Sequence, residues 1–212
     1  MAGRASRPTV VGAVAVPAER WARWVENFAS RHGATALAVG DGALRGTAED
    51  GSTFAAHLPF ATAYAGPADA GAFLAAVEVP TRWGVLLVRK GGFAVARLAG
   101  PVLAEHKIGQ RHVQGRTKAG GQSQQRFARR RDNQARQAYE AAAEHAARIL
   151  AGPALPVVTG GDHAAIDEVL ADPRLRHVTV TAPWLAVPDP RRGVLDRAVA
   201  DAQAVWVEVV NR

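Results

Sequence analysis

One short stretch of the sequence combines residue types that could act on a carbonyl group. It is Gly120-Gly121-Gln122, the GGQ tip, followed by Ser123. Two adjacent glycines let the backbone adopt conformations closed to other residues and approach another surface closely. A glutamine amide has no useful pKa, but it donates and accepts hydrogen bonds and can therefore orient a water molecule. A backbone N–H of the tip could also donate to the oxyanion that develops on the carbonyl group. The tip is therefore suited to hydrolysis in which the water is oriented and the oxyanion is stabilised electrostatically.

The residues around the GGQ tip carry essentially all of the excess positive charge. Residues 106–136 contain nine basic side chains and one acidic side chain, a net charge of +8, whereas the whole chain carries +7. The nine basic residues are Lys107, Arg111, Arg116, Lys118, Arg126, Arg129, Arg130, Arg131 and Arg136. Solvated faces ordinarily mix both signs, so a block of one sign indicates a polyphosphate partner.

Other candidate catalytic or metal-binding residues lack the spacing that their chemistry requires. The scattered histidines His106, His112, His163 and His177 form no His-x-x-x-His or His-Glu-x-x-His pattern. We therefore expect no metal site and interpret them as structural or surface residues. The chain has no cysteine, which excludes thiol catalysis and disulfides and fits a reducing cytoplasm.

Carboxylates in the second half of the chain could suggest a two-metal nuclease. The candidates are Asp162, Asp167 and Glu168, but the first predicted strand of that half, 83–89, carries no carboxylate. We therefore reject nuclease chemistry and interpret Asp162 as a helix N-cap. Ser123 likewise has no base spaced to activate it and is expected to cap a helix.

Elements from residue 81 onward must position the GGQ tip, and their pattern predicts a mixed sheet with packed helices. Strands are expected at 83–89, 93–98, 102–113, 155–159, 177–181 and 206–210. Helices are expected at 123–150, 162–170 and 191–204, with a loop at 114–121. The order through residue 204, before the terminal strand, is β-β-β-α-β-α-β-α, which is RNase H-like and indicates an α+β or α/β fold.

The long helix behind the GGQ tip has two distinct faces. Arg126, Arg129, Arg130 and Asn133 follow the i, i+3, i+4, i+7 spacing of one helical face. The apolar face, which should pack on the sheet, contains Phe127, Ala135, Ala138, Tyr139, Ala142, Ala146 and Ile149. The predicted arrangement is a glycine–glutamine tip on a rigid, arginine-faced stem.

The pattern of residues 1–80 predicts a separate, small α+β module. Residues 81–212 are then expected to form the domain that bears the GGQ tip. Strands are expected at 10–16, 35–39, 43–47 and 53–58, with helices at 17–31 and 68–77. On the first helix, Trp21, Trp24, Val25 and Phe28 share one face, and we favour core packing over base stacking for the tryptophans.

The setting of the GGQ tip closely resembles a known catalytic region. Residues 120–131, which read GGQSQQRFARRR, resemble the GGQ region of class I peptide-chain release factors of archaea and eukaryotes. The predicted order of elements over about 81–205 resembles their catalytic middle domain, as does the strand that leads into Gly160-Gly161-Asp162. The resemblance implies that domain's fold for about three-fifths of the chain.

The length of the chain restricts which release-factor family it resembles. Class I release factors carry a further domain that reads stop codons and another that recruits a GTPase, and 212 residues leave no room for both. The chain is similar instead to the short bacterial branch of the Vms-like release factor (VLRF) family, which frees nascent chains from tRNA on stalled ribosomes. His106-Lys107, before the predicted loop, also resembles a feature of that family.

The resemblance implies a peptidyl-tRNA hydrolase that cleaves the peptide–tRNA ester on stalled ribosomes, for rescue or quality control, without reading a stop codon. Its catalytic residues would be Gln122, Gly121 and Gly120, acting at the peptidyl transferase centre of the large subunit with no cofactor. Family members often carry a Gly-Ser-Gln-like tip, so Gln124 is the alternative to Gln122. The residues implied in RNA binding are Arg116, Lys118, Arg126, Arg129 and Arg130.

The expected partners are the ribosome and peptidyl-tRNA, with neither DNA nor a membrane. No apolar run approaches the roughly 20 residues that span a bilayer, and no secretory signal is recognisable, so we expect a cytoplasmic protein. Two alternatives remain: a non-catalytic rRNA- or tRNA-binding module on the ribosome, and a structural protein built on a degenerate release-factor fold. The intact GGQ tip argues against both, because binding alone requires the arginines but not the tip.

Overall fold

The computed structural model describes residues 9–110 and 122–212, and its chain divides into two compact units. The first unit contains residues 1–79 and 200–212, and the second contains residues 80–199. The predicted second domain, 81–212, differs from this division in its last residues, 200–212. The physical reason is strand pairing, because the last strand, β10 (Val205–Asn211), hydrogen-bonds to strands of the first unit.

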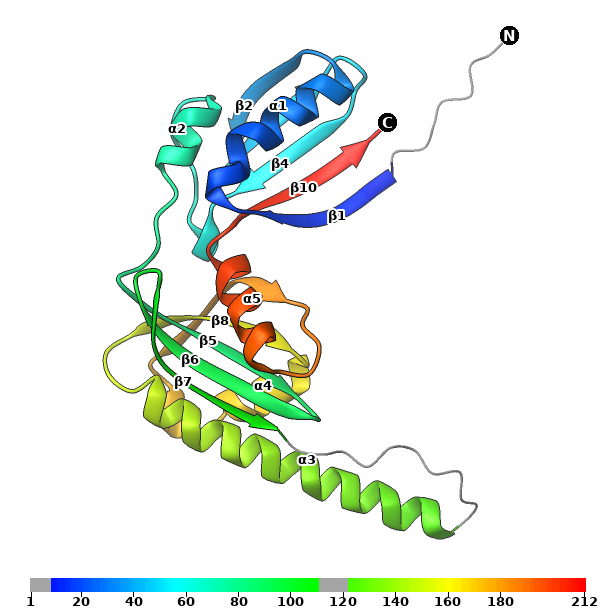
Figure 1. Cartoon of the computed structure of the whole chain (residues 1–212), viewed down its shortest axis with the longest axis vertical. Coiled ribbons are helices and arrows are strands. Elements are labelled where there is room, and N and C mark those ends of the chain that lie inside the picture. The colour runs from blue at the N-terminus through cyan, green and yellow to red at the C-terminus, as the bar shows by residue number, and fades with distance from the viewer. Residues whose placement is uncertain (1–8, 111–121) are drawn as a thin grey trace. The chain divides into compact units, whose positions relative to one another are not determined.

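The first unit is a five-stranded antiparallel sheet with a helix packed on it (Figure 1). Its strand order is β1-β10-β4-β3-β2. The strands besides β10 are β1 (Thr9–Val16), β2 (Thr35–Gly40), β3 (Ala43–Ala48) and β4 (Thr53–His57). The helices are α1 (Trp21–His32), α2 (Ala70–Ala75) and the short 3-10 turns at Ala18–Arg20 and Pro59–Ala61. The meander predicted for 35–58 is present as β2, β3 and β4.

The tryptophans of α1 belong to the core of the first unit. Trp21 is fully buried, and Trp24 stacks on it with a ring-centroid distance of 5.7 Å. Phe54 of β4 meets both indole rings edge-on. This packing confirms the preference for a core role over base stacking.

The second unit contains a five-stranded mixed sheet of order β7-β6-β5-β8-β9. Its strands are β5 (Arg82–Arg89), β6 (Gly92–Ala99), β7 (Val102–Gln110), β8 (Leu155–Gly161) and β9 (Val178–Leu185). Its helices are α3 (Gln122–Ile149), α4 (His163–Leu170), the 3-10 turn Pro173–Leu175 and α5 (Arg192–Ala202), whose last residues belong to the first unit. Strands β5, β6 and β7 pair antiparallel, whereas β5–β8 and β8–β9 are parallel. The predicted β-β-β-α-β-α-β-α order and mixed fold class are confirmed.

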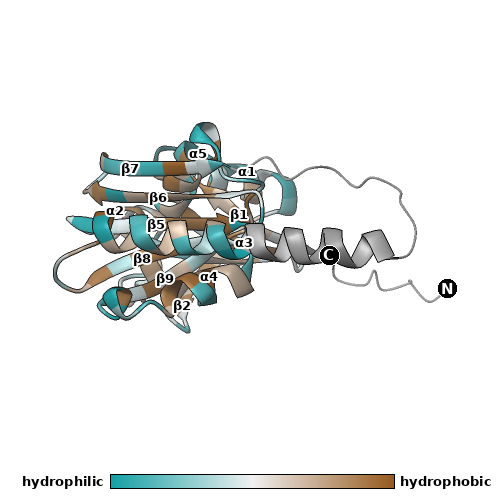
Figure 2. Ribbon diagram, turned by 90° about the horizontal axis from the view of Figure 1, so that it is seen from below, coloured by the Kyte–Doolittle hydropathy of each residue, from teal (hydrophilic) through white to brown (hydrophobic). Residues whose placement is uncertain are grey.

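Helices cover both faces of this sheet. Helices α3 and α4 lie on one face and α5 on the other (Figure 1). Figure 2 shows α3 crossing in front of strands that are largely hydrophobic. Among the described residues, no helix combines the length and the apolar character needed to cross a bilayer.

Candidate functional site

The GGQ tip lies where β7 connects to α3. Strand β7 ends at Gln110 and α3 begins at Gln122. Gly120 and Gly121 lie outside the described residues, as do the predicted RNA-binding residues Arg116 and Lys118. The predicted residues Gln122, Gln124, Arg126, Arg129 and Arg130 belong to α3, but their side chains lie outside the described part. The catalytic and RNA-binding roles of these residues therefore stay predictions. The structure defines how the rest of α3 is held on the sheet.

The C-terminal half of α3 is firmly packed on the sheet. Its buried residues are Ala138, Tyr139, Ala142, Ala146 and Ile149, as the predicted apolar face required. They contact a core cluster that includes Leu86, Val88, Phe93 and Val95 of β5 and β6. Because α3 has 28 residues and extends about 40 Å at 1.5 Å per residue, this packing anchors only part of it. Figure 1 shows the helix continuing past the edge of the sheet toward Gln122.

An ion-pair cluster joins α3 to the edge strand β7. Glu105 of β7 accepts from Arg148 of α3 at 2.5 Å and from Arg97 of β6 at 3.3 Å. The hydrogen bond from Arg148, helped by the one from Arg97, lowers the pKa of the Glu105 carboxyl below its usual range. Arg97 also donates to the carbonyl oxygen of Ile149 at 3.1 Å. This cluster ties the C-terminal end of α3 to the two strands that lead into the GGQ tip.

Neighbouring residues of β7 point to opposite faces of the sheet, which separates His106 from Lys107. Lys107 pairs in register with Val95, whose side chain belongs to the core under α3. His106 pairs with Ala96 and lies 3.4 Å from Arg192 of α5, measured between ring Nε2 and guanidinium Nη1. The side chains of His106 and Lys107 therefore lie on opposite faces of the sheet.

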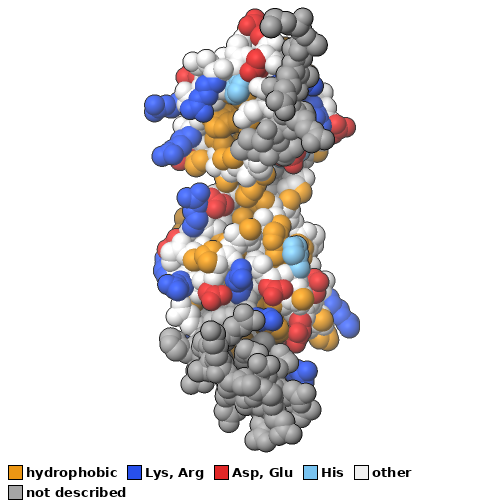
Figure 3. All heavy atoms as spheres, turned by 90° about the vertical axis from the view of Figure 1, so that its right-hand side faces the viewer, with side chains coloured by type: hydrophobic (Ala, Val, Ile, Leu, Met, Phe, Trp, Pro, Cys, Tyr) orange, Lys and Arg blue, Asp and Glu red, His pale blue; other side chains and the backbone are white. Residues whose placement is uncertain are grey.

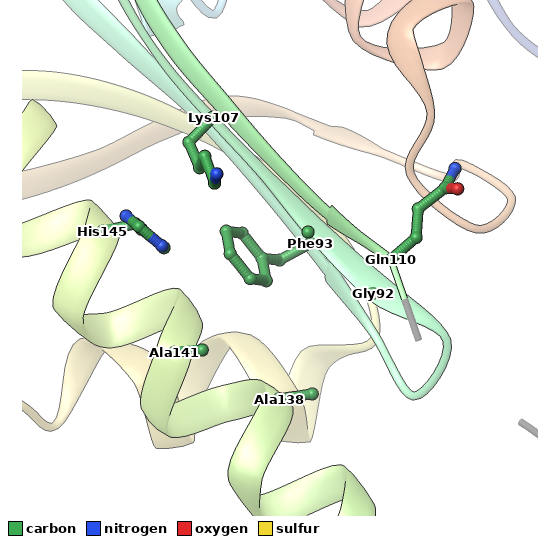
Figure 4. Close-up of a pocket in the computed structure, with 8 residues that line it drawn as sticks. Gly92, Phe93, Lys107, Gln110, Ala138, Ala141 and His145 are labelled. Atoms are coloured by element: carbon green, nitrogen blue, oxygen red, sulfur yellow. The ribbon is translucent and has the colours of Figure 1, made fainter. Parts of the chain in front are cut away.

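A pocket of about 220 Å³ opens between β6, β7 and α3 on the Lys107 face (Figure 4). Its lining is Gly92, Phe93, Lys107, Gly109, Gln110, Ala138, Ala141 and His145. The rings of Phe93 and His145 stack with centroids 5.6 Å apart and an interplanar angle of 28°. Figure 4 shows Lys107 and His145 directed into the space and the Gln110 side chain directed away from it. No carboxylate is among the described residues that line it.

The carboxylates considered for nuclease chemistry have structural surroundings. Asp162 is the N-cap of α4, as predicted, and its side chain accepts from the backbone N–H of Ala164 at 3.1 Å. Asp167 and Glu168 are exposed on α4. Burial raises the pKa of Tyr139, and the negative charges of Asp162 and Glu168 add to that shift. Capping and surface exposure account for these carboxylates without a metal.

Two of the histidines that were considered for a metal site make identifiable contacts. His163 stacks on Trp184 with ring centroids 3.5 Å apart, and His177 Nε2 lies 2.8 Å from the carbonyl oxygen of Leu150. His112 lies outside the described residues. Within the described part of the chain, no group of three His, Cys, Asp or Glu residues could hold a metal ion.

Two features of the second unit were not foreseen from the sequence. One is the pocket beside Phe93 and Lys107, and the other is the ion pair of Arg89 with Asp189, at 3.4 Å between Nε and Oδ1. Both join residues far apart in the chain. The only sequence signal for the pocket was the run of small residues, glycine and alanine, on its lining elements.

Figure 3 shows basic and acidic side chains intermingled on the face that it presents. Residues outside 106–136 sum to a net charge of −1, since the segment carries +8 and the chain +7. The positive potential is therefore concentrated on β7, α3 and the segment between them.

Comparison with known proteins identifies the family of the chain. A search of curated proteins finds no match. A family model described as the Actinobacteria/chloroflexi VLRF1 release factor matches residues 81–208. The match covers more than half of the chain and spans β5 to β10, including the GGQ tip and the anchored helix α3. The chain therefore belongs to the VLRF1 release-factor family.

Proposed function

We propose that this protein hydrolyses the ester between a nascent peptide and tRNA on stalled ribosomes, without reading a stop codon. The observation that carries the proposal is the family match over 81–208, which includes Gly120-Gly121-Gln122 at the start of α3. The packing of the C-terminal half of α3 supports it. A reacting group at the end of a long helix must be held against another molecule, and a rigid, anchored stem provides that.

In the proposed reaction, the amide of Gln122 orients a water molecule against the ester carbonyl carbon. The water oxygen bonds to that carbon, and the bond to the ribose 3′ oxygen breaks. One proton of the water ends on the ribose hydroxyl, and the peptide leaves as a carboxylic acid. A glutamine amide cannot accept the proton, so that transfer falls to groups of the ribosome or the tRNA. A backbone N–H near Gln122 stabilises the oxyanion, and Gly120 and Gly121 give that backbone access.

The basic residues would hold the protein on RNA. Arg116, Lys118, Arg126, Arg129 and Arg130 are proposed to contact phosphates of the large subunit or the tRNA. Such contacts position a protein without reading sequence. These contacts would account for the concentration of positive charge in residues 106–136. The choice of which ribosomes the protein acts on would then depend on the state of the ribosome and not on RNA sequence.

Release of labelled peptide from stalled ribosome–nascent-chain complexes tests the proposal. Gln122→Ala should slow release by about a hundredfold, because it removes the group that orients the water. Ribosome binding, measured by co-sedimentation, should remain close to that of the wild type.

Gln124→Ala is the matched control, since it removes the same side chain from the same helix. Normal release by Gln122→Ala together with failure of Gln124→Ala would move the catalytic assignment to Gln124. If both variants release peptide at the wild-type rate, the glutamine mechanism is wrong.

The second candidate is a non-catalytic RNA-binding module on the ribosome. The +8 charge of residues 106–136 favours it, because that charge alone suffices for binding. The same assay separates the two candidates. A wild-type protein that binds stalled ribosomes but releases peptide from none of them would establish the binding module.

A further inference from the structure

The pocket beside β7, called the slot below, has small residues on two of its sides. Gly109 makes room for the Phe93 ring that lines the slot, because a Cβ at residue 109 would lie 2.2 Å from Cε1 of Phe93. The bare backbone lets the Phe93 ring lie across β7, paired in register with Gly109. On the helix side, Ala138 and Ala141 are too short to fill the space. Small residues on both walls therefore leave an opening lined by Phe93, which is 4% exposed, and by the half-buried His145.

The size and chemistry of the slot restrict its occupant. Its volume of about 220 Å³ is below the roughly 300–1,000 Å³ of pockets that enclose drug-sized ligands, so one planar ring is a better fit. Phe93, Ala138 and Ala141 provide the apolar surface, and the His145 ring stacks on that of Phe93. Lys107 is exposed and directed into the space (Figure 4), and no acidic residue is among the described residues that line the slot.

We infer that this slot accepts one unstacked nucleobase of single-stranded RNA, with Lys107 on a neighbouring phosphate. Proteins that read single-stranded RNA stack bases on aromatic or histidine rings and neutralise the backbone with lysine or arginine. Lys107 belongs to the +8 segment, so β7 carries the charge of that segment to the mouth of the slot. An acidic peptide would find only one cation and an apolar floor. The inference rests on the proposed function only in taking RNA as the partner.

Binding of a short fluorescein-labelled oligouridylate to the full chain, followed by anisotropy over a range of salt concentrations, tests the slot. Ala141→Phe fills it and should weaken binding by about tenfold without changing the salt slope, because stacking is lost and no phosphate contact is. Lys107→Gln should weaken binding and reduce the slope of log K against log salt by about 1. Arg176→Gln, which removes an exposed cation at the opposite end of the sheet, should change neither.

A photo-crosslink gives a second readout that does not depend on substitution. An oligouridylate containing 4-thiouridine should crosslink to peptides that contain Phe93 or His145. His145→Ala, which opens the slot instead of filling it, should lower both the affinity and the crosslink yield. This variant keeps the test valid if Ala141→Phe lowers the thermal midpoint.

The proposal of a nucleobase slot is wrong if Ala141→Phe and His145→Ala both bind the oligouridylate with wild-type affinity. It is also wrong if the crosslinks form only at peptides that contain neither Phe93 nor His145. A third contradicting result is slot-dependent binding of an oligoglutamate peptide but not of RNA. Failure of the proposed function looks different. A protein that binds RNA through the slot but releases no peptide refutes only the hydrolase, and one that releases peptide without slot-dependent binding refutes only the slot.

Discussion

Single side chains from other segments of the chain contact the carbonyl groups at the C-terminal end of α3. Arg97 donates to the carbonyl oxygen of Ile149, Arg82 donates to that of Ala151, and His177 contacts that of Leu150. The last carbonyl groups of a helix have no partner inside it and carry the negative end of its dipole. Side chains from β5, β6 and the turn before β9 therefore satisfy these carbonyls, and they fix the end of the helix that is farthest from the GGQ tip.

Asp172 offers a residue-scale prediction about pH. Its carboxylate accepts from the backbone N–H and the guanidinium of Arg174, and the guanidinium bond, followed by the backbone bond, lowers its pKa from 3.8 to about 2. A lowered folded-state pKa stabilises the fold above the unfolded value and loses that stabilisation as the pH falls through the folded value.

Asp172→Asn keeps a capping oxygen but removes the charge. It should therefore unfold at a lower temperature than the wild type near pH 6, and the difference should close between about pH 4 and pH 2. Thermal unfolding followed by circular dichroism over that range measures it. A difference that is unchanged at pH 2 would mean that the ion pair is not its cause.

At the scale of elements, the junction between β8 and α4 depends on close backbone contact. Gly161 has φ +105°, and a Cβ there would lie 2.3 Å from the carbonyl oxygen of Val88. The next residue, Asp162, donates its N–H to that same oxygen at 2.9 Å and then caps α4. The Gly160-Gly161-Asp162 sequence is therefore required by the turn from strand to helix.

Gly161→Ala should lower the free energy of unfolding by about 2 kcal/mol or more, because it combines an unfavourable φ with a backbone clash. Gly193→Ala is the matched control, since it lies in α5 with no atom within 4 Å of the added Cβ. There the alanine should stabilise by about 0.5 kcal/mol. Urea unfolding compares the two variants, and similar values for both would contradict the proposed clash.

At the scale of the whole molecule, the last strand of the chain pairs with strands from its N-terminal part. β10 lies between β1 and β4, and its residues Val205 and Val207 are fully buried in the core of the first unit. Residues 1–79 by themselves would leave β1 without its partner and would expose one side of β4. The first unit is therefore completed only when the C-terminal strand is present.

Truncation after Gln203 should unfold the first unit while the sheet of the second unit stays protected. Hydrogen exchange measures this, with loss of protection expected in β4 (Thr53–His57) and retention expected in β5 (Arg82–Arg89). Removing a buried central strand takes away both its backbone hydrogen bonds and its apolar side chains. Unchanged protection in β4 would show that the first sheet is stable without β10.

Local patterns in the sequence determined most elements of this protein. The strand alternation, the glycine turns and the apolar stripe of α3 depend on neighbouring residues, so they could be predicted without a fold. The N-cap role of Asp162 was predictable for the same reason. The candidate catalytic tip was likewise recognisable from consecutive residues, Gly120-Gly121-Gln122.

Only the tertiary structure decided which distant segments meet. A terminal strand with the pattern of β10 could pair with either sheet, because backbone hydrogen bonding is the same at any open position. The structure places it in the first unit, against the sequence-based division. The slot likewise depends on the register of β6 and β7 and on the position of α3, which bring Phe93, Lys107 and His145 together. Such long-range contacts are set by how whole surfaces pack, and no local pattern records them.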